Sequence, residues 1–391
     1  MTKRLYYEDS FKKHFTATVL ECQRAQNLYA IKLDQSAFFP GGGGQPEDYG
    51  TLNGQVVYKL IEEGETLYHM VEHPFEIGQK VEGKINFSRR LDFMQQHSGE
   101  HILSGIIERF YGYSNVGFHL SEETVTADFD GILTENQIRE IEKLANEAIR
   151  EDQAVVCKMY TKEQLETKVF RSKKVFEHDV RLVSIGESDC CACCGVHVKR
   201  AGQIGLIKIL SAQKHRGGMR LMLKCGLRAL EDYENKLNQN REISRLLSVP
   251  IEEVTSGVRG LWEEKQDLKQ KLYSIEEKYF NTLIETLSSH GPICRVEEGL
   301  TPDGLRRLMS KLFLKTPWPC FILVPEEGGF KYALGQRDQT LLPLCKALNE
   351  AFEGRGGGKD ICQGSLKGDL SDIQERFKEL VFASQGKCSA L

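Results

Sequence analysis

His97 and His101 stand four residues apart. In a helix this spacing places both imidazoles on one face, so both can reach a single metal ion. A second pair lies far along the chain, where Cys193 and His197 flank Gly195, and glycine permits a tight turn between a thiolate and an imidazole. Two histidines from a helix with a cysteine and a histidine from a turn make a complete nitrogen and sulfur set for tetrahedral zinc. The sequence therefore predicts one Zn²⁺ held by these four side chains.

Ser98 separates this pattern from that of zinc proteases. In a His-Glu-x-x-His helix the general base directly follows the first histidine, whereas here Ser98 takes that position and Glu100 precedes the second. At ~100° per residue, Glu100 points away from the ion by about a quarter turn, which disfavours a protease. We expect Glu100 to be an exposed helix carboxylate or to orient a ligand. Gln95 and Gln96 either line the pocket, where Gln96 would support catalysis, or form polar helix surface.

Three further cysteines leave the identity of the thiolate ligand open. Cys190 with Cys193, and Cys191 with Cys194, have Cys-x-x-Cys spacing, so a second structural zinc or a redox pair is an alternative. No other Cys-x-x-Cys pair occurs in the chain, which weighs against a four-cysteine ribbon. The remaining eight of the 12 cysteines stand singly, which is typical of inert buried thiols in a cytoplasmic protein.

A glycine run precedes these groups. Gly41, Gly42, Gly43 and Gly44 lead directly into Gln45. Backbone N–H groups can approach a ligand closely only where no Cβ intervenes, and Gln45 then offers an amide to a substrate's carbonyl or amino group. We expect these five residues to bind substrate. The alternative is a plain glycine turn between two strands.

The elements that must position these residues begin with a β-rich segment. In residues 1–86, β-branched and aromatic stretches such as Leu28–Leu33 alternate with turn residues, which predicts a small β-barrel. The pattern then becomes helical, with Ser88 as the expected cap and Gly112 as the stop. That helix carries His97 and His101.

The remainder of the second segment mixes helix and strand. A helix is expected over residues 134–149, capped by Thr134, and strands are expected at 180–185 and 204–210, on either side of the cysteine cluster. Residues 87–226 are therefore predicted to form an α+β domain.

Two further segments complete the chain. Residues 227–288 are polar, with leucine and tyrosine at intervals of three, four and seven, and Pro250 interrupts them. This predicts a helical hairpin or coiled coil, acting as a solvated spacer or as a dimerisation arm. Residues 289–391 alternate strand and helix, which predicts a C-terminal α/β domain. The fold class is α+β with four domains.

Composition limits the partners. The 391 residues are 40% hydrophobic and 28% charged, which excludes a disordered or fibrous chain. The net charge is −4, from 52 basic and 56 acidic residues, so no bulk attraction to nucleic acid or membrane exists and a nucleic acid must be held by local patches. Neither a signal core nor a membrane-length apolar run is present, so the expected location is cytoplasmic, with neither membrane nor DNA as a partner.

These motifs together resemble the editing module shared by alanyl-tRNA synthetases and the free-standing AlaX proteins. The His-x-x-x-His helix and the Cys-x-x-x-His turn fall in the family's order, after a glycine loop in Phe38–Gly50 that is similar to the family's own. Gly217–Arg220 is similar to the short stretch that closes the editing fold. The run Gly354–Gly364 resembles the signature of the DHH-associated C-terminal domain.

The resemblance implies a long-form AlaX protein. Only 37 residues precede Phe38, so no aminoacylation core is expected. The implied activity is trans-editing: hydrolysis of the ester in Ser-tRNA(Ala), and of Gly-tRNA(Ala), by zinc that activates a water or anchors the aminoacyl group for attack by a positioned water. Gly41 and Val196 replace threonines of the family's motifs, which leaves the substrate preference open.

Two rival functions use the same residues. A non-catalytic, zinc-stabilised tRNA-binding partner of a synthetase is one, and a zinc hydrolase of small esters or amides is the other. The implied partners are tRNA(Ala) and a second copy of the chain, paired through the hairpin and C-terminal domain. The basic residues expected to meet tRNA are Lys173, Lys174, Lys214 and Arg216, with a further patch at Arg306, Arg307 and Lys311.

Overall fold

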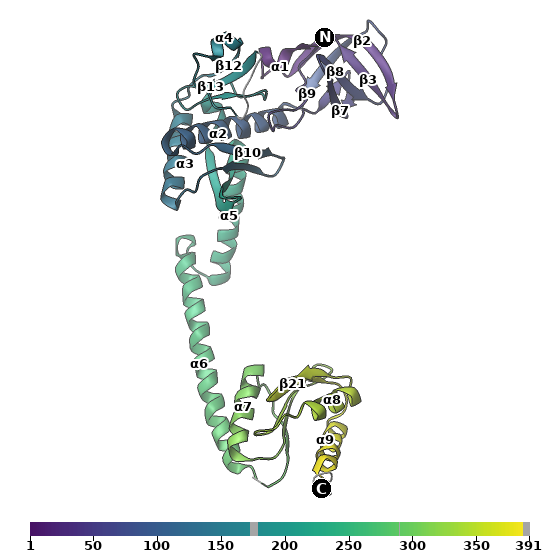
Figure 1. Cartoon of the computed structure of the whole chain (residues 1–391), viewed down its shortest axis with the longest axis vertical. Helices are drawn as coiled ribbons and strands as arrows, with labels where there is room; N and C mark the ends of the chain where they lie inside the picture. The colour runs from purple at the N-terminus through teal and green to yellow at the C-terminus, as the bar shows by residue number, and fades with distance from the viewer. Residues whose placement is uncertain (173–178, 289, 386–391) are drawn as a thin grey trace. The chain divides into compact units, whose positions relative to one another are not determined.

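The computed structural model describes residues 1–172, 179–288 and 290–385 (Figure 1). The chain divides into two compact units, Met1–Glu242 and Ile243–Leu391. Both units contain helices and β-sheet, which agrees with the mixed fold class. None of the described helices combines the length and the apolar composition that crossing a bilayer requires. The division into four domains stays a prediction.

The first unit begins with a nearly closed barrel. Seven antiparallel strands follow the order β6-β5-β9-β2-β3-β8-β7. Tyr58 joins the two edge strands, and its N–H donates to the carbonyl of Met70 in β8 at 2.9 Å. The strands are β2 (His14–Ala25), β3 (Leu28–Leu33), β5 (Gly50–Leu52), β6 (Gln55–Val57), β7 (Lys59–Glu63), β8 (Thr66–Val71) and β9 (Lys80–Ile85). Short elements flank them: β1 (Lys3–Arg4), α1 (Leu5–Glu8) and β4 (Gln35–Ser36).

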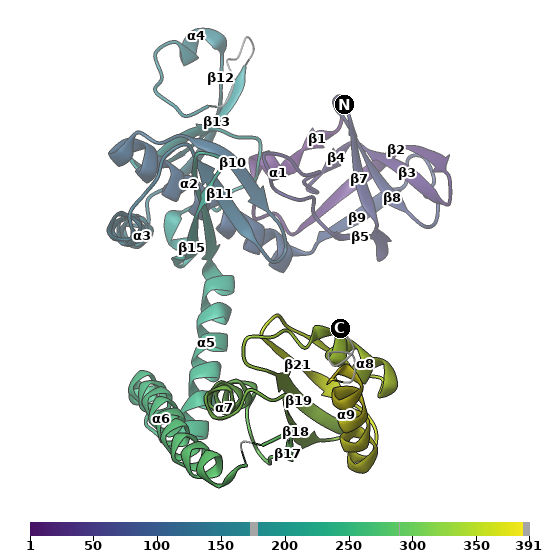
Figure 2. The ribbon, with the colours of Figure 1, turned by 60° about the horizontal axis from the view of Figure 1, so that its bottom comes forward.

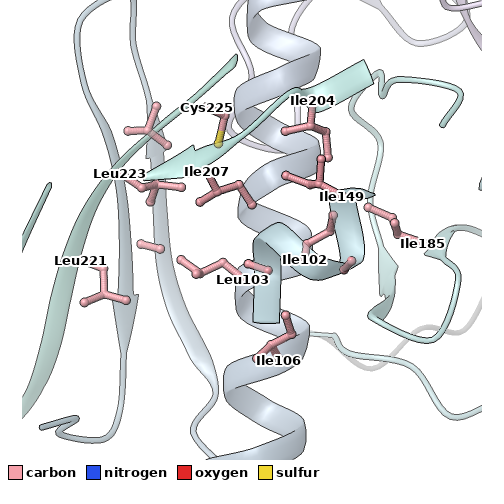
Figure 3. Packing of buried hydrophobic residues seen from close by; sticks show 14 of the residues in the cluster. Ile102, Leu103, Ile106, Ile149, Ile185, Ile204, Ile207, Leu221, Leu223 and Cys225 are labelled. Carbon is pink, nitrogen blue, oxygen red and sulfur yellow. The ribbon is translucent and has the colours of Figure 1, made fainter. Parts of the chain in front are cut away.

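The long helix α2 (Phe87–Tyr111) forms the centre of the first unit (Figure 2). Its middle is buried on all sides, because it packs against two sheets and the helix α3 (Glu135–Arg150). One sheet has the order β10 (Asn115–Leu120), β11 (Val125–Phe129), β16 (Gly218–Cys225), β15 (Ile207–His215); the other is β12 (Val155–Tyr160), β13 (Val180–Ile185), β14 (Asp189–Ala192). Figure 3 shows Ile102, Leu103 and Ile106 of α2 among residues of these elements.

Capping explains where the helices begin. Asn86, not the expected Ser88, caps α2, since its side chain accepts from the N–H of Arg89, and Gly112 ends the helix in the left-handed region with φ 69°. Thr134 caps α3 with a reciprocal bond from Gln137, as predicted. The strand expected at 204–210 is instead the end of the 3₁₀ turn η1 (Ala201–Ile204) followed by β15. The short helix α4 is Lys162–Leu165.

The second unit contains a five-stranded sheet covered on both faces. Its order is β17 (Ile293–Val296), β18 (Cys320–Glu326), β19 (Gly329–Gly335), β21 (Ile361–Leu366), β20 (Arg355–Gly357). Alternate residues of β18 enter two cores: Cys320, Ile322 and Val324 join α7 (Pro302–Lys315), whereas Phe321 and Leu323 join α8 (Leu342–Ala351) and α9 (Leu370–Gln385). This bears out the expected alternation of strand and helix.

The polar stretch between the sheets is helical, as predicted. It comprises α5 (Gly226–Leu247), the 3₁₀ turn η2 (Ile251–Glu253) after Pro250, and α6 (Val254–Thr286). The helix α6 lies in the second unit, where Phe280 and Leu283 near its end pack with α7. Whether the two helices form a hairpin or a coiled coil stays a prediction.

Candidate metal centre and its cavity

The four side chains predicted to bind zinc converge at one point. Candidate ligand atoms of His97, His101, Cys193 and His197 all lie within 4.8 Å of one another. The two helix histidines project from α2, and the other two residues follow β14 in a loop. Cys193 Sγ is 3.5 Å from His97 Nε2. The three histidine rings are buried, so the set forms a compact nitrogen and sulfur group that matches zinc chemistry.

Each histidine uses its second nitrogen for a protein partner. His97 Nδ1 is 2.9 Å from Gln45 Oε1, His101 Nδ1 is 2.9 Å from Asp189 Oδ2, and His197 Nδ1 is 3.1 Å from Ser98 Oγ. These contacts leave the three Nε2 atoms as the ligand atoms. His197 Nε2 is buried without a hydrogen-bond partner among the described residues. A buried, unpaired nitrogen beside two imidazoles and a thiol fits a bound metal ion.

The partner of His101 is itself held in place. Arg171 donates from Nε and Nη2 to the two oxygens of Asp189 at 2.6 and 2.9 Å. Burial raises the pKa of Asp189, but His101 and Arg171 together hold that pKa below its usual range. Asp189 therefore carries a negative charge, and a carboxylate behind a histidine raises that ligand's basicity.

Electrostatics also favour a cation. Burial opposes ionisation of Cys193, yet the surrounding His97, His101 and His197 hold its pKa well below the usual value. Burial, reinforced by His97, lowers the pKa of His197 to about 3. Burial also lowers the pKa of His101, but Asp189 and Cys193 outweigh burial and raise that pKa well above the ordinary value. The thiolate of Cys193 and the neutral imidazole of His197 are the forms in which such residues bind metal.

The other cysteines differ from Cys193. Burial raises the pKa of Cys191 to about 11 and also raises that of Cys194. Cys190 accepts a hydrogen bond from Ser184 at 3.2 Å. Cys191 forms a second group of potential ligand atoms with His101 and Asp189. Within the described residues, only Cys193 combines a lowered pKa with three converging histidines.

The glycine run forms a turn beside the cysteine loop. All four glycines have positive φ, between 61° and 145°, a conformation that other residues rarely adopt. Gly42 and Gln45 exchange backbone hydrogen bonds of 2.9 and 3.0 Å. The Gln45 side chain is buried, and its Oε1 accepts from His97 and from the N–H of Val196 at 3.2 Å.

This placement changes the expected role of Gln45. Its carbonyl oxygen is engaged with the metal set, and the residue is absent from the described lining of the adjoining cavity. Gly43 and Gly44 do line that cavity. A buried ion pair fixes the loop, since Arg90 of α2 binds Asp48, and Asp48 also accepts from the N–H of Phe39 at 2.6 Å.

The cavity beside the metal set has a volume of about 590 Å³. His97, His101 and Cys193 face it, whereas His197 is not part of its lining. Phe118 of β10 stacks on His97 with ring centroids 5.1 Å apart. The lining also includes charged and polar side chains: Glu100, Glu108, Ser114, Asn115, Arg171, Asp179 and Arg181.

Glu100 is not the exposed carboxylate that was one of its expected roles. It is 4% exposed, because β10 covers this part of α2. Its Oε1 accepts from Ser104 and from Asn115 Nδ2, the latter at 2.6 Å. Asn115 lies 15 positions away, so the periodicity of the helix gave no signal for it.

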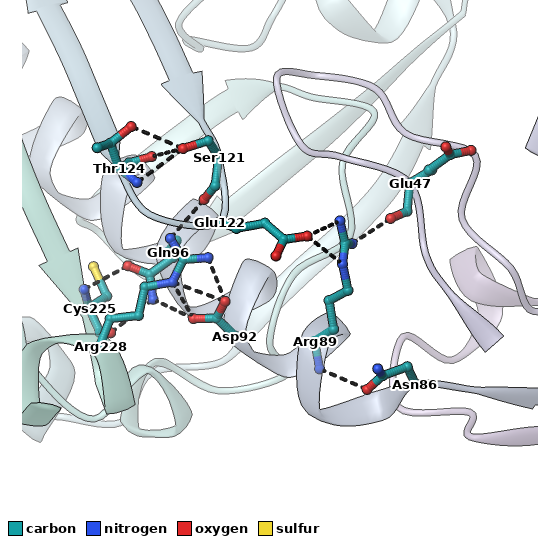
Figure 4. Close-up of polar contacts among 10 residues, drawn as sticks. All are labelled: Glu47, Asn86, Arg89, Asp92, Gln96, Ser121, Glu122, Thr124, Cys225 and Arg228. Carbon is teal, nitrogen blue, oxygen red and sulfur yellow. Dashed lines mark hydrogen bonds and ion pairs between the residues drawn. The ribbon is translucent and has the colours of Figure 1, made fainter. Parts of the chain in front are cut away.

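The expected roles of Gln95 and Gln96 were wrong. Both are buried, but neither lines the cavity, because their side chains bond the backbone of other segments. Gln95 donates to the carbonyl of Gln203 at 2.9 Å. Gln96 bonds both backbone groups of Cys225, at 2.9 and 2.7 Å, and also contacts Asp92 (Figure 4). In the same network Arg228 binds Asp92, so these residues join α2 to the start of α5.

The residues expected to contact tRNA differ in their exposure and in their ion pairs. Lys214 and Arg216 are exposed at the turn between β15 and β16, whereas Lys173 and Lys174 lie outside the described residues. In the second patch, Arg307 pairs with Glu276, Glu277 and Asp303, and Lys311 with Glu277. These two side chains therefore attach α7 to α6.

Comparisons with known proteins find similar chains among alanine–tRNA ligases and editing proteins. A family model described as "Threonyl and Alanyl tRNA synthetase second additional domain" matches residues 180–221, which contain Cys193 and His197. An alanine–tRNA ligase from Pyrococcus abyssi is 30% identical over 97% of this chain and 43% of its own length. The chain thus spans less than half of the ligases it matches.

Two relatives match over nearly their whole length. The alanyl-tRNA editing protein AlaX-L of Pyrococcus horikoshii is 26% identical over 95% of this chain and 96% of its own. The alanyl-tRNA editing protein Aarsd1 of Mus musculus is 25% identical over 95% of both. Among solved structures, the C-Ala domain of Aquifex aeolicus alanyl-tRNA synthetase is 21% identical, covering 23% of this chain and 89% of that domain, with a TM-score of 0.22. Over nearly its whole length the chain is similar to proteins named alanyl-tRNA editing proteins, and over a shared region it is similar to alanine–tRNA ligases.

Proposed function

We propose that the chain is a trans-editing deacylase that hydrolyses the ester of Ser-tRNA(Ala), and of Gly-tRNA(Ala), at a zinc site. The observation that carries this proposal is the convergence of one thiolate and three imidazole Nε2 atoms at the wall of a cavity, with every Nδ1 already satisfied. Relatives that share the full length are named alanyl-tRNA editing proteins.

The residues around the cavity suit an aminoacyl ester. Zinc bound here would supply Lewis acidity toward the ester carbonyl or a water. In the described part of the chain, the N–H groups of Gly43 and Gly44 donate to no protein acceptor, so they can donate to the oxygen that gains charge during hydrolysis. Arg181, which donates to the carbonyls of Cys193 and Gly195, places a positive charge on the cavity wall, and this charge suits the phosphates at the end of a tRNA.

One observation favours the non-catalytic alternative. Four protein ligands close a tetrahedral zinc, and a closed zinc is structural. For a direct role in activating water, one ligand must open toward the cavity. Of the two candidates for this, Cys193 faces the cavity and His197 does not. In a direct role of the metal, Cys193 would therefore be the ligand that gives up its place; in the other mechanism, a positioned water would attack the ester and all four residues would keep holding the metal.

Metal content and deacylation, measured on one preparation, test the proposal. We expect stoichiometric zinc, rapid hydrolysis of Ser-tRNA(Ala), and slow hydrolysis of Ala-tRNA(Ala). His97→Ala and Cys193→Ala should lose both zinc and activity, whereas Cys190→Ala, at a nearby cysteine that does not line the cavity, should keep both. Full activity after removal of zinc by a chelator, or equal rates on Ala-tRNA(Ala), would contradict the function.

A further inference from the structure

Glu100 is a buried carboxylate next to the four candidate metal ligands, and it has no ion-pair partner among the described residues. Glu100 directly precedes the candidate ligand His101, lines the cavity, and is 4% exposed. Among the described residues it forms no ion pair with any lysine, arginine or histidine. Burying a carboxylate is unfavourable unless charge and hydrogen bonds compensate it. Its Oε1 has two donors, Ser104 and Asn115, but Oε2 has none in the described chain.

A second acceptor lies next to it. Asn115 is 9% exposed, and its Oδ1 is buried without a hydrogen-bond partner among the described residues. The orientation of this amide follows from chemistry, since Nδ2 donates to Glu100 at 2.6 Å and to Ser104 at 3.0 Å. Turning the amide over would set Oδ1 against a carboxylate oxygen. The unpaired acceptor is therefore a property of the site, and Asn115 is one of the residues that line the same cavity.

The two free acceptors define the chemistry of what they bind. Together they offer one negative charge, at least two lone-pair positions and no donor, which matches a primary ammonium group with its three N–H donors. A hydroxyl would bring one donor and no charge. In an aminoacyl ester, the α-ammonium is separated from the reacting carbonyl carbon only by Cα. A receptor for it must therefore share one cavity with the metal set, as Glu100 and Asn115 do.

We propose that Glu100 and Asn115 form the receptor for the α-ammonium of the aminoacyl ester. This inference rests on the proposed function and extends it to the class of substrate: esters with a free amino terminus. An N-acylated ester, such as that of a peptidyl-tRNA, has lost the positive charge and two of the three donors. It leaves the acceptors unpaired, so the site rejects it.

The test compares Ser-tRNA(Ala) with N-acetyl-Ser-tRNA(Ala). The wild type should prefer the free amine in kcat/KM by at least roughly 10-fold, the value expected for a charge-assisted hydrogen bond. Glu100→Gln keeps the shape and an acceptor for Ser104 and Asn115 but removes the charge. We expect it to lose most of that preference while it keeps zinc. A residue with only a structural role would slow both substrates in parallel.

Two controls keep the outcome clear. Glu108→Gln alters another cavity carboxylate of α2, one that lies 3.7 Å from Arg171, and should leave the preference unchanged. Binding of 3′-seryl-amino-3′-deoxyadenosine, which cannot be hydrolysed, should weaken in Glu100→Gln, whereas its N-acetyl form should bind equally to variant and wild type. If Glu100→Gln does not fold, Asn115→Ala provides the same comparison.

The outcomes separate the two proposals. No hydrolysis of Ser-tRNA(Ala) by the wild type overturns the proposed function. Hydrolysis with equal rates on both esters, or a preference that survives both Glu100→Gln and Asn115→Ala, leaves the function in place and overturns the ammonium receptor.

Discussion

Three histidines at the candidate metal centre are held by three different chemical groups. An amide orients His97, a carboxylate orients His101, and a hydroxyl contacts His197. Such contacts fix the tautomer and the angle of each ring, so they govern how tightly the metal binds. The partner residues therefore belong to the metal centre as much as the ligands do.

For Gln45, an experiment can distinguish a role as the partner of His97 from a role in binding substrate. In Gln45→Ala, His97 loses its Nδ1 acceptor, so zinc affinity should fall by ~10–100-fold and deacylation should fall with it. Zinc competition with a fluorescent chelator measures the first effect. If zinc affinity is unchanged while deacylation is lost, Gln45 contacts substrate and not the metal set.

His69 gives the barrel a predicted pH dependence. It is fully buried between Ser36 Oγ at 2.8 Å and the carbonyl of Ile31 at 3.1 Å, and burial lowers its pKa to about 4. The folded barrel keeps it neutral, whereas the unfolded chain binds a proton below about 6.5. The free energy of unfolding should therefore decrease as the pH falls from about 6.5 to about 4, by at most about 3 kcal/mol.

Urea unfolding at several pH values measures this effect. His69→Gln cannot titrate, so its stability should depend less steeply on pH than that of the wild type over the same range. Parallel pH profiles for the two proteins would show that His69 does not couple protonation to folding.

At the scale of elements, the loop after β14 must approach α2 without obstruction. A Cβ added at Gly195 would lie 2.4 Å from Cε1 and 2.6 Å from Nδ1 of His97. The φ angle of Gly195 is not positive. Glycine is therefore required here by the close approach to His97 and not by the tight turn that the sequence predicted. The candidate metal centre thus depends on the absence of a side chain where two elements meet.

Gly195→Ala should displace His97 or the loop. We expect zinc content and deacylation to fall by an order of magnitude or more, because a shift of about 1 Å at a reacting centre costs about 100-fold. Gly260→Ala is the matched control, since a Cβ there meets nothing within 4 Å and α6 favours alanine. Wild-type zinc content in Gly195→Ala would refute the close approach.

Contacts between segments that lie far apart in the chain limit what the sequence could predict about the site. Local signals were reliable where they act over a few residues, as in the capping of α3 by Thr134 and the termination of α2 at Gly112. The partners of the three histidines lie 52, 88 and 99 positions away from them. Helix periodicity contains no information about such distant residues, so it left Asp189 undetected and left open whether Glu100 is exposed or orients a ligand.

At the scale of the molecule, α6 presents apolar side chains that its own unit does not cover. Leu261, Leu268 and Leu272 are 47–56% exposed and line one shallow groove. Their spacing of seven and four fits pairing of helices. We propose that two copies of the chain meet along this face, which is one of the two alternatives, dimerisation arm or solvated spacer, that the sequence left open.

Light scattering after gel filtration tests this association. Leu268→Glu should convert a dimer to a monomer, because it places a charge within an apolar contact. Lys271→Glu changes an exposed residue of the same helix outside the groove, and should remain dimeric. A monomeric wild type at micromolar concentration would contradict the proposal.

The ion pair between Arg90 and Asp48 has a consequence for binding thermodynamics. Four successive glycines are ordinarily the most mobile stretch of a chain, and a ligand that orders them loses affinity to conformational entropy. Here the run is fastened to α2 at Asp48 through Arg90 and at Gln45 through His97. The conformational entropy of the glycine loop is therefore lost when the chain folds and not when substrate binds. We expect the loop to be in its binding conformation before an aminoacyl ester binds.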